Sequence, residues 1–340
     1  MENPFAFSIA PMMKCTDRHC RYLMRLISRR ARLYTEMVTS AALVRGRDPQ
    51  RVLAFDPSEQ PLALQLGGSD PAQLATAARM AEDWGFNEIN LNVGCPSDRV
   101  TSGRFGACLM AEPDLVAACV AAMNTTVRIP VTVKTRIGID ELDSDAHLDH
   151  FVTTVAAAGC DTFIIHARKA WLKGLSPKEN REIPPLKYER VYALKRSFPT
   201  LRLVLNGGLK TCGGALTALA DHGTTLDGVM LGRAPYDEPY MLADVDRLFY
   251  ADTTAPFSRA EVAEAYVAYA RTAIDADRGG HVRPHHVLRH AAGLFHGRAN
   301  ARQWRQTLAK AGQDFQEIGQ DLDKLALLAR TLDSQPALAA

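Results

Sequence analysis

Residues 61–95 read PLALQLGGSDPAQLATAARMAEDWGFNEINLNVGC, and this stretch decides the fold. Two short runs, Leu62–Leu66 and Glu88–Leu91, have the length and the flanking turn residues of buried strands. Between them, Asp70–Trp84 carries apolar residues at helical spacing and opens with an aspartate followed by a proline, a typical helix start. A strand, a helix and a strand in this order predict a parallel βαβ unit.

The same alternation recurs on both sides of this unit. Eight strand-like runs can be counted: Phe7–Ala10, Leu33–Thr35, Leu62–Leu66, Glu88–Leu91, Val131–Lys134, Thr162–Ile165, Leu203–Leu205 and Gly228–Leu231. Eight such units over about 245 residues match the usual size of a (β/α)8 barrel. A doubly wound sheet is the alternative, but it usually carries GxGxxG after its first strand, where this chain has APMMKCTD. We therefore predict an α/β fold with a (β/α)8 TIM barrel over residues 1–250.

The pattern changes after Tyr250. ADTTAPFSR, residues 251–259, has the composition of a linker, and nothing beyond it resembles a strand. Phe257–Ala276 carries apolar residues at helical spacing behind a possible N-cap at Ser258, and another helix occurs at Glu112–Met123 inside the barrel region. The sequence predicts a C-terminal α-helical domain over residues 256–333.

The composition is that of an ordinary globular protein. Of the 340 residues, 47% are hydrophobic and 23% are charged, and a net charge of +2 gives no overall reason to expect a polyanionic partner. Seven cysteines contain no CxxC pair, which favours a reducing compartment. The N-terminus lacks the pattern of a signal peptide, and no apolar run is long enough for a membrane span. We expect a cytoplasmic monomer with no membrane and no DNA partner.

In a barrel, the carboxyl ends of the strands form one catalytic face. Cations, amides, glycines and a thiol dominate among the residues at the ends of the predicted strands: Pro11, Met12, Met13, Glu36, Gln65, Asn90, Asn92, Cys95, Lys134, Arg136, His166, Arg168, Asn206, Gly207, Gly208, Gly232 and Arg233. Loops after the seventh and eighth strands often hold a phosphate, and here they contain NGG and GR. Glycines let backbone N–H groups approach phosphate oxygens, although the same residues also suit plain tight turns.

Two of these side chains favour a flavin as the ligand of the barrel mouth. Lys134 lies on a buried-looking strand, and a lysine there can stabilise the negative charge that reduced flavin mononucleotide (FMN) builds near N1. Gln65 can hydrogen-bond the pyrimidine edge of the flavin ring. The alternatives are a structural ion pair for Lys134 and a capped strand end for Gln65.

Cys95 follows a predicted strand between Gly94 and Pro96, where a thiol can act as a proton donor or as a nucleophile. His166 ends another strand, where a neutral imidazole can bind a phosphate or a pyrimidine carbonyl. The alternatives are a small buried hydrophobe for the cysteine and a satisfied core histidine. His286 and His290 are four residues apart, but no further ligand is near in sequence, so we predict no metal site.

The motifs APMM, QLGG, NLNVGCPSDRV, VTVKTRIG, HAR, NGG and LGR resemble those of the tRNA-dihydrouridine synthase family, in the same order, over residues 7–236. The cysteine-containing run is the most specific of them. HARKAWLKGLSPKENREIPPL (166–186) and ARQWR (301–305) are similar to the A-type subfamily, which extends the resemblance into the C-terminal domain.

The resemblance implies a barrel that binds FMN at its mouth, NADPH as reductant and a helical domain that grips tRNA. The implied FMN contacts are Met12, Met13, Gln65, Lys134, His166, Asn206, Gly207, Gly208, Gly232 and Arg233, to which we add Pro11 from its position. Cys95 is implied as the proton donor and Asn92 as a contact of the RNA base. Lys178, Arg181, Arg302 and Arg305 are implied as tRNA contacts. The implied reaction reduces uridine to 5,6-dihydrouridine in the D-loop of tRNA, with hydride from FMN N5 to C6 and a proton from Cys95 to C5.

The charge distribution supports an RNA partner independently of the resemblance. Residues 278–310 contain seven Lys or Arg, five His and no Asp or Glu. Trp304 and Phe295 lie in this basic stretch and can either stack on bases or pack in a helical core. Two other functions remain open, an FMN-dependent oxidoreductase of a free pyrimidine that resembles the dihydroorotate dehydrogenases, and a non-catalytic tRNA-binding protein.

Overall fold

The computed structural model describes residues 3–97, 103–221, 223–276, 282–313 and 318–335. The chain forms two compact units, one of residues 1–13 and 32–232 and the other of residues 14–31 and 233–340. No helix in the described ranges is both long and apolar enough to cross a lipid bilayer.

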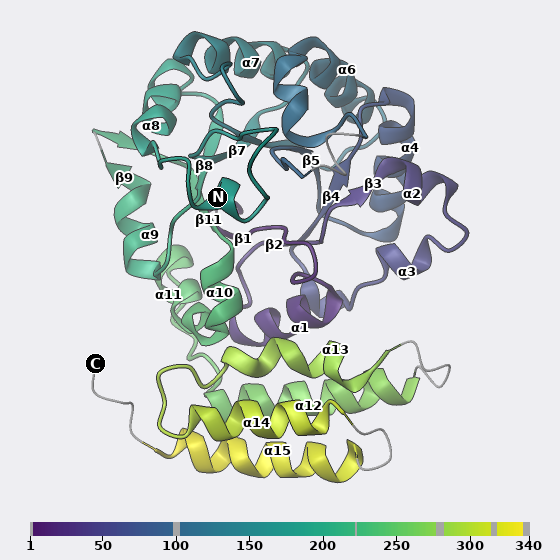
Figure 1. Ribbon diagram of the computed structural model, residues 1–340, viewed down its shortest axis with the longest axis vertical. Coiled ribbons are helices and arrows are strands. Elements are labelled where there is room, and N and C mark those ends of the chain that lie inside the picture. Colours follow the sequence, from purple (N-terminus) through teal and green to yellow (C-terminus); the bar gives the residue numbers. More distant parts are fainter. Residues whose placement is uncertain (1–2, 98–102, 222, 277–281, 314–317, 336–340) are drawn as a thin grey trace. The chain divides into compact units, whose positions relative to one another are not determined.

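The first unit is a barrel of parallel strands (Figure 1). Its strands are β1 (Phe7–Ile9), β2 (Leu33–Tyr34), β4 (Leu62–Gly67), β5 (Glu88–Val93), β6 (Val131–Arg136), β7 (Thr162–His166), β8 (Arg202–Asn206) and β11 (Gly228–Leu231), and β3 (Val38–Thr39) adds to β4. They pair in the order β1, β11, β8, β7, β6, β5, β4, β2. The ring closes where Arg32 bridges Ser8 of β1 and its carbonyl accepts the Ile9 N–H at 2.9 Å. The predicted TIM barrel is confirmed.

Helices connect the strands and cover the outside of the barrel. They are α2 (Ser40–Arg45), α3 (Gln50–Leu53), α4 (Pro71–Trp84), α6 (Pro113–Asn124), α7 (Asp145–Ala157), α8 (Tyr188–Ser197) and α9 (Cys212–Leu219), with short 3-10 turns η1 (Pro57–Glu59), η2 (Gly106–Ala111) and η3 (Glu179–Arg181) and a small hairpin of β9 (Ala220–Asp221) and β10 (Thr224–Thr225).

Helix α4 forms where the sequence predicts it. Asp70 caps its start by accepting the N–H groups of Ala72 and Gln73 at 3.0 and 3.2 Å. Its apolar stripe is fully buried, and Gly85 ends the helix at φ +103°, a conformation that glycine adopts without strain. The stripe and the two end signals together explain why this segment is helical.

The register of the strands decides which side chains face the barrel interior. Register partners on neighbouring parallel strands point to the same side of a sheet, and residues two apart on one strand do so as well. Ile164, Val204 and Met230 pack together in a buried cluster, so the polar residues that follow at two-residue spacing, His166 and Asn206, also face inward. The barrel mouth is therefore lined by the side chains that end the strands.

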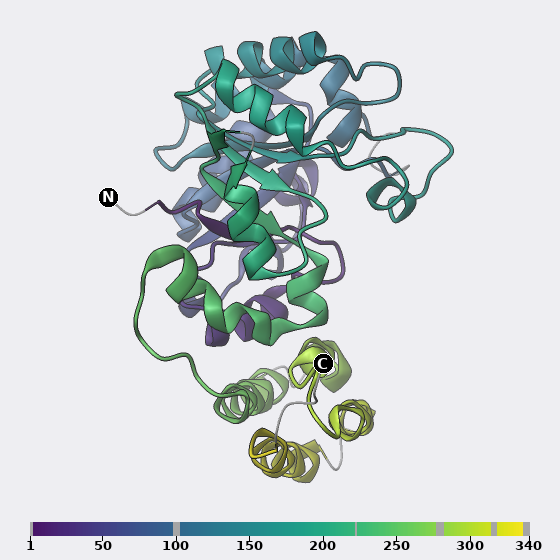
Figure 2. The same ribbon diagram turned by 90° about the vertical axis from the view of Figure 1, so that its left-hand side faces the viewer.

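The second unit is helical. It contains α1 (Arg18–Ile27), α10 (Arg233–Asp237), η4 (Pro239–Asp244), α11 (Val245–Tyr250), α12 (Arg259–Ala276), α13 (Pro284–Leu288), η5 (Arg289–Gly293), α14 (Ala301–Ala311) and α15 (Ile318–Asp333). Figure 2 shows the C-terminal helices, coloured green to yellow, nearly end-on and grouped together. Helix α1 precedes the second strand but groups with this unit. The predicted domains 1–250 and 256–333 therefore remain predictions.

Aromatic residues form part of the core of the helical unit. The rings of Phe295 and Trp304 lie 4.8 Å apart, both are buried, and the Trp304 Nε1–H donates to the Ala291 carbonyl at 2.8 Å. Both rings therefore pack in the core rather than being free to stack on bases. The expected C-terminal helical domain is confirmed as a set of helices.

Candidate functional site

Lys134 on β6 and Asn206 on β8 meet at the barrel mouth, on either side of β7. The Lys134 Nζ donates to Asn206 Oδ1 at 3.0 Å, and Asn206 Nδ2 donates to the Met230 carbonyl at 2.8 Å. Burial, together with the charge of Arg136, lowers the pKa of Lys134 from 10.5 to about 7, and a negative charge on Cys95 acts in the opposite direction. Because the lysine's hydrogen-bond partner is an amide and not a carboxylate, its charge is poorly compensated by the protein.

Gln65 is part of a network of interior amides. Its Nε2 donates to Asn90 Oδ1 at 2.8 Å, and its Oε1 accepts from Asn92 Nδ2 at 2.9 Å. All three side chains are buried. The glutamine therefore lies inside the barrel mouth on strand β4, and its amide is oriented by neighbours on β5.

Cys95 is held in a tight loop directly after β5. Its N–H and that of Gly94 donate to Asn92 Oδ1 at 2.9 and 3.1 Å, and its carbonyl accepts the Ala107 N–H at 2.9 Å. The thiol is half-buried, and its Sγ lies 3.6 Å from the hydroxyl of Ser97. It is close enough for its charge to affect the pKa values of Lys134 and Arg136. The thiol and the lysine therefore share one site.

Arg136 ties this loop to the next one. Its Nε donates to the Gly94 carbonyl at 2.9 Å, and its Nη1 donates to the carbonyls of Lys169 and Asn180 at 3.1 and 2.9 Å. Asn180, which is fully buried, also exchanges hydrogen bonds with the backbone of Trp171 at 2.8 and 2.9 Å. The guanidinium therefore fixes the loop of the cysteine against the loop after β7.

His166 lies against the glycine turn that follows β8. Burial lowers the pKa of His166 well below its usual value, and the charges of Arg136 and Lys134 lower it further, so the imidazole is neutral. Gly207 and Gly208 have φ values of +111° and +72°, and a Cβ on Gly207 would lie 2.5 Å from His166 Cδ2. Glycine is therefore required here for backbone conformation and for space.

The loops after β1 and β11 also meet at the mouth. A Cβ on Gly232 would lie 3.3 Å from the Met12 Sδ, whereas Met13 is 57% exposed. Pro11 is half-buried, and Arg233, the first residue of α10, is exposed. Backbone and sulfur atoms of these loops thus lie beside the ring of polar side chains.

The predicted tRNA contacts are all exposed apart from Asn92. Lys178 and Arg181 lie in the loop after β7, on either side of the buried Asn180, and Arg302 and Arg305 lie on α14. Arg181 is close enough to lower the pKa values of His166 and Arg136. The loop therefore brings cations to the barrel mouth.

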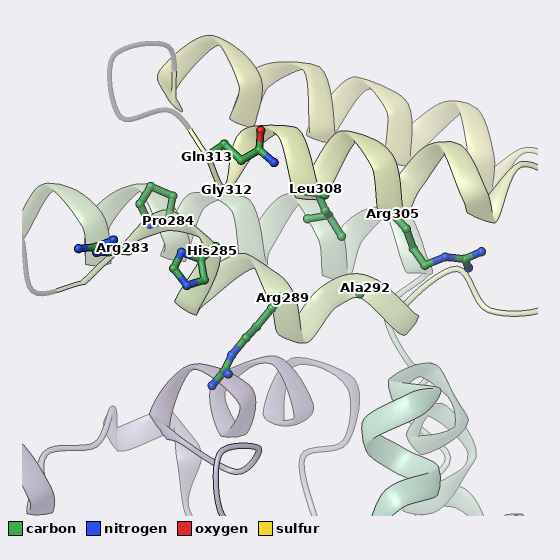
Figure 3. A pocket seen from close by; sticks show the side chains of 10 residues that line it. Arg283, Pro284, His285, Arg289, Ala292, Arg305, Leu308, Gly312 and Gln313 are labelled. Atoms are coloured by element: carbon green, nitrogen blue, oxygen red, sulfur yellow. The ribbon is translucent and has the colours of Figure 1, made fainter.

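A shallow cavity of about 660 Å³ lies on the helical unit between α13 and α14. Arg283, His285, Arg289 and Arg305 line it together with the apolar side chains of Pro284 and Leu308 (Figure 3). The basic stretch is not uniformly exposed, because His290 is buried and its ring forms a hydrogen bond with Asp17. The same carboxylate accepts a hydrogen bond from Arg289. Arg278 and His281 lie outside the described residues.

No group of three or more potential metal ligands occurs in the described ranges. The histidines that lie four residues apart in the sequence have different surroundings, since His286 is exposed and His290 is buried against Asp17. Partial loss of hydration, together with the charges of His285, Arg289 and Arg283, lowers the pKa of the exposed His286.

The family model for dihydrouridine synthase (Dus) matches residues 8–330 of this chain. The chain is a dihydrouridine synthase family member. Among its relatives is the tRNA-dihydrouridine(20/20a) synthase of Shewanella oneidensis, which is 57% identical over 304 residues, or 89% of this chain and 88% of the relative. The Salmonella typhimurium protein of the same name is 54% identical over 328 residues, or 95% of this chain and 96% of the relative.

The fold of this dihydrouridine synthase also resembles a solved structure with a different name. The 2-naphthoyl-CoA reductase complex with 2-naphthoyl-CoA matches with a TM-score of 0.55 and 13% identity, over 70% of this chain and 49% of that chain. At this identity the likeness concerns the fold alone.

Sequence reasoning missed several residues that organise the site of this dihydrouridine synthase. Asn90 and Arg136 were placed at the strand ends without a role, and Glu88, Thr132 and Asn180 were not singled out. The first four lie on β5 (EINLNV) and β6 (VTVKTR) at interior positions, where polar residues at every second position of a buried strand are the available sequence signal. Asn180 lies in a loop and offers no such signal.

Proposed function

We propose that this protein is a tRNA-dihydrouridine synthase, an oxidoreductase that reduces uridine to 5,6-dihydrouridine in the D-loop of tRNA with FMN as cofactor and NADPH as reductant. The observation that carries the proposal is the meeting of Lys134, Cys95 and the glycine turn at Gly207 in one barrel mouth. The names of the relatives support uridines 20 and 20a as the targets. A cytoplasmic location and a monomeric state remain predictions.

The residues of the mouth fit FMN. The half-buried Lys134 donates its hydrogen bond to an uncharged amide, so its ammonium group gains from an anionic partner such as the N1 region of reduced flavin. Backbone N–H groups at positive φ suit a phosphate. The residues that would hold FMN are Pro11, Met12, Met13, Gln65, Lys134, His166, Asn206, Gly207, Gly208, Gly232 and Arg233. Bound FMN would supply the hydride for C6 of the uracil ring after reduction by NADPH.

Cys95 supplies the proton in the proposed reaction. Its Sγ–H transfers the proton to C5 of the uracil, and the positive charges of Lys134 and Arg136 stabilise the thiolate that remains. The thiol regains a proton from solvent because it is half-buried and not enclosed. Asn92 holds the loop of the thiol and is positioned to contact the same base.

The RNA must present the target base outside its stack, at a cost of a few kcal/mol. Exposed cations at Lys178, Arg181, Arg302 and Arg305 can repay this cost through phosphate contacts. The cationic lining of the cavity at α13 and α14 supports tRNA docking on the helical unit (Figure 3).

The test uses the purified full-length protein and unmodified tRNA. We expect a yellow protein whose flavin is bleached by NADPH and re-oxidised by tRNA, with dihydrouridine detected by mass mapping. Cys95→Ala should keep FMN and NADPH oxidation but lose most dihydrouridine formation, whereas Cys108→Ala, a change at another half-buried thiol, should retain it. Normal product formation by Cys95→Ala would remove this thiol from the mechanism.

The same experiment separates the other two functions. An enzyme of free pyrimidines would reduce uracil or a related small base without tRNA, and its rate would be insensitive to salt. A non-catalytic tRNA-binding protein would be colourless and unaffected by NADPH. Either result would overturn the proposed function.

A further inference from the structure

A chain of buried side chains begins deep in the barrel at Glu88. Its carboxylate forms an ion pair with Arg32 at 3.0 Å, and its Oε1 accepts hydrogen bonds from the Tyr34 hydroxyl at 2.7 Å and the Thr132 hydroxyl at 2.6 Å. Glu88 and Thr132 are both fully buried. The carboxylate therefore acts as a fixed acceptor inside the barrel.

The acceptor sets the direction of the next hydrogen bonds. A hydroxyl has one proton, and Thr132 gives its proton to the carboxylate, so its oxygen must accept from the Nδ2 of Asn90, 2.8 Å away. The Asn90 Oδ1 is then left to accept from Gln65 Nε2 at 2.8 Å. Asn90 is fully buried.

The other end of the chain imposes the same direction. The N–H groups of Gly94 and Cys95 can only donate, and both donate to Asn92 Oδ1. Asn92 must therefore present its Nδ2 to the Oε1 of Gln65, 2.9 Å away. The two ends of a side-chain amide are nearly equal in shape, so their orientation follows from such hydrogen bonds. Both ends of the chain assign one orientation to Gln65.

We propose that Thr132 and Asn90 are positioning residues. Because Glu88 accepts the Thr132 proton, each hydrogen bond from Glu88 to the barrel mouth has one fixed direction. These two residues orient the amide of Gln65, which keeps one N–H and one oxygen lone pair for a ligand, and they hold the loop of Cys95 through Asn92. This inference rests on the roles proposed for Gln65 and Cys95 in the enzyme. The chain itself is a property of the protein without ligand.

Two substitutions at Thr132 separate the hydrogen bond from packing. Valine keeps the shape of threonine but lacks the hydroxyl, whereas serine keeps the hydroxyl and loses a methyl group. In the ligand-free full-length protein, Thr132→Val should raise amide hydrogen exchange at Gly94 and Cys95 roughly fivefold or more, the effect of weakening one hydrogen bond. In Thr132→Ser, the amides of Gly94 and Cys95 should exchange at the same rate as in the parent protein.

Tyr34→Phe is the matched control, because it removes a different donor to the same oxygen of Glu88 and leaves the chain to Gln65 intact. Its exchange at Gly94 and Cys95 should not change. If Thr132→Val does not fold, Gln65→Met cuts the chain nearer the mouth and should raise exchange at the same two amides. The proposal would be overturned if amide exchange at Gly94 and Cys95 did not change in the folded Thr132→Val or Gln65→Met variant. It would also be overturned if Thr132→Ser raised this exchange as much as Thr132→Val.

The FMN dissociation constant and the visible spectrum of the bound flavin provide a second readout. Thr132→Val should weaken FMN binding and shift the spectrum, and Thr132→Ser should restore both. Failure of the proposed function is a separate outcome. If the parent protein forms no dihydrouridine, the proposed enzymatic activity is wrong, but the hydrogen-exchange data still test whether Thr132 and Asn90 orient Gln65.

Discussion

Replacing Lys134 with methionine should change how the stability of the ligand-free protein depends on pH. The lysine lies half-buried at the barrel mouth, where its ammonium group donates a hydrogen bond to Asn206 Oδ1 at 3.0 Å. Burial, aided by the charge of Arg136, lowers its pKa from 10.5 to about 7. Methionine has a similar length and no charge, so it removes the cost of burying the ammonium group.

The sign follows from proton binding. Because the folded-state pKa lies below the unfolded value, the unfolded chain binds more protons between pH 7 and pH 10.5, and stability rises with pH in this window. The destabilisation by Lys134 is thus fully present below about pH 7 and is relieved toward pH 10.5. At about 1.4 kcal/mol per pKa unit the whole effect is roughly 5 kcal/mol, of which roughly 2–3 kcal/mol falls between pH 6 and pH 9.

The free energy of unfolding, measured in urea at pH 6, 7.5 and 9, tests this reasoning. The advantage of Lys134→Met over the parent should shrink by roughly 2–3 kcal/mol from pH 6 to pH 9. The free energy lost with the hydrogen bond to Asn206 is the same at every pH, so it cancels when the pH values are compared. Lys173→Met, at an exposed lysine, is the control and should follow the parent. Parallel pH profiles for Lys134→Met and the parent would show that the lysine is charged in the folded protein up to high pH, contrary to the argument.

Two further predictions concern the glycine turn and the helical unit. Gly207→Ala should destabilise the protein by roughly 1–3 kcal/mol, because φ is +111° and the new methyl group would meet the histidine ring at the end of β7. Gly213→Ala, in a helix with open space around it, should be neutral or slightly stabilising in the same denaturation assay, and equal effects would contradict the steric reasoning. Arg302→Ala combined with Arg305→Ala should weaken tRNA binding and lower the slope of log affinity against log salt by about 1–2. Arg128→Ala, an exposed change before β6, should leave that slope within error of the parent; an unchanged slope in the double variant would remove α14 from the tRNA-binding surface.

The alternation of strand-like runs and helices was sufficient to predict the barrel. This succeeded because the signals are local: a cap at Asp70, a proline after it and a glycine at position 85 mark the ends of one helix whatever surrounds it. The loop of Cys95 was likewise recognisable, because its glycine and proline neighbours follow directly after a strand.

The partners of the side chains could not be predicted in the same way. The basic stretch included His290, yet this histidine is buried against Asp17, 273 residues earlier in the chain. Trp304 packs on Phe295 for the same reason, since burial depends on which helices meet. The grouping of α1 with the C-terminal helices also depends on such distant contacts.

By itself, the sequence determined which segments become strands and helices and which residues stand at the ends of the strands, because turns, caps and periodicity act over a few residues. Only the tertiary structure decided that Lys134 is bound by Asn206 and that Gln65 is oriented from Glu88. Those hydrogen bonds join strands that are adjacent in the barrel or separated by one strand, and their direction is fixed by donors and acceptors that only the folded barrel brings together.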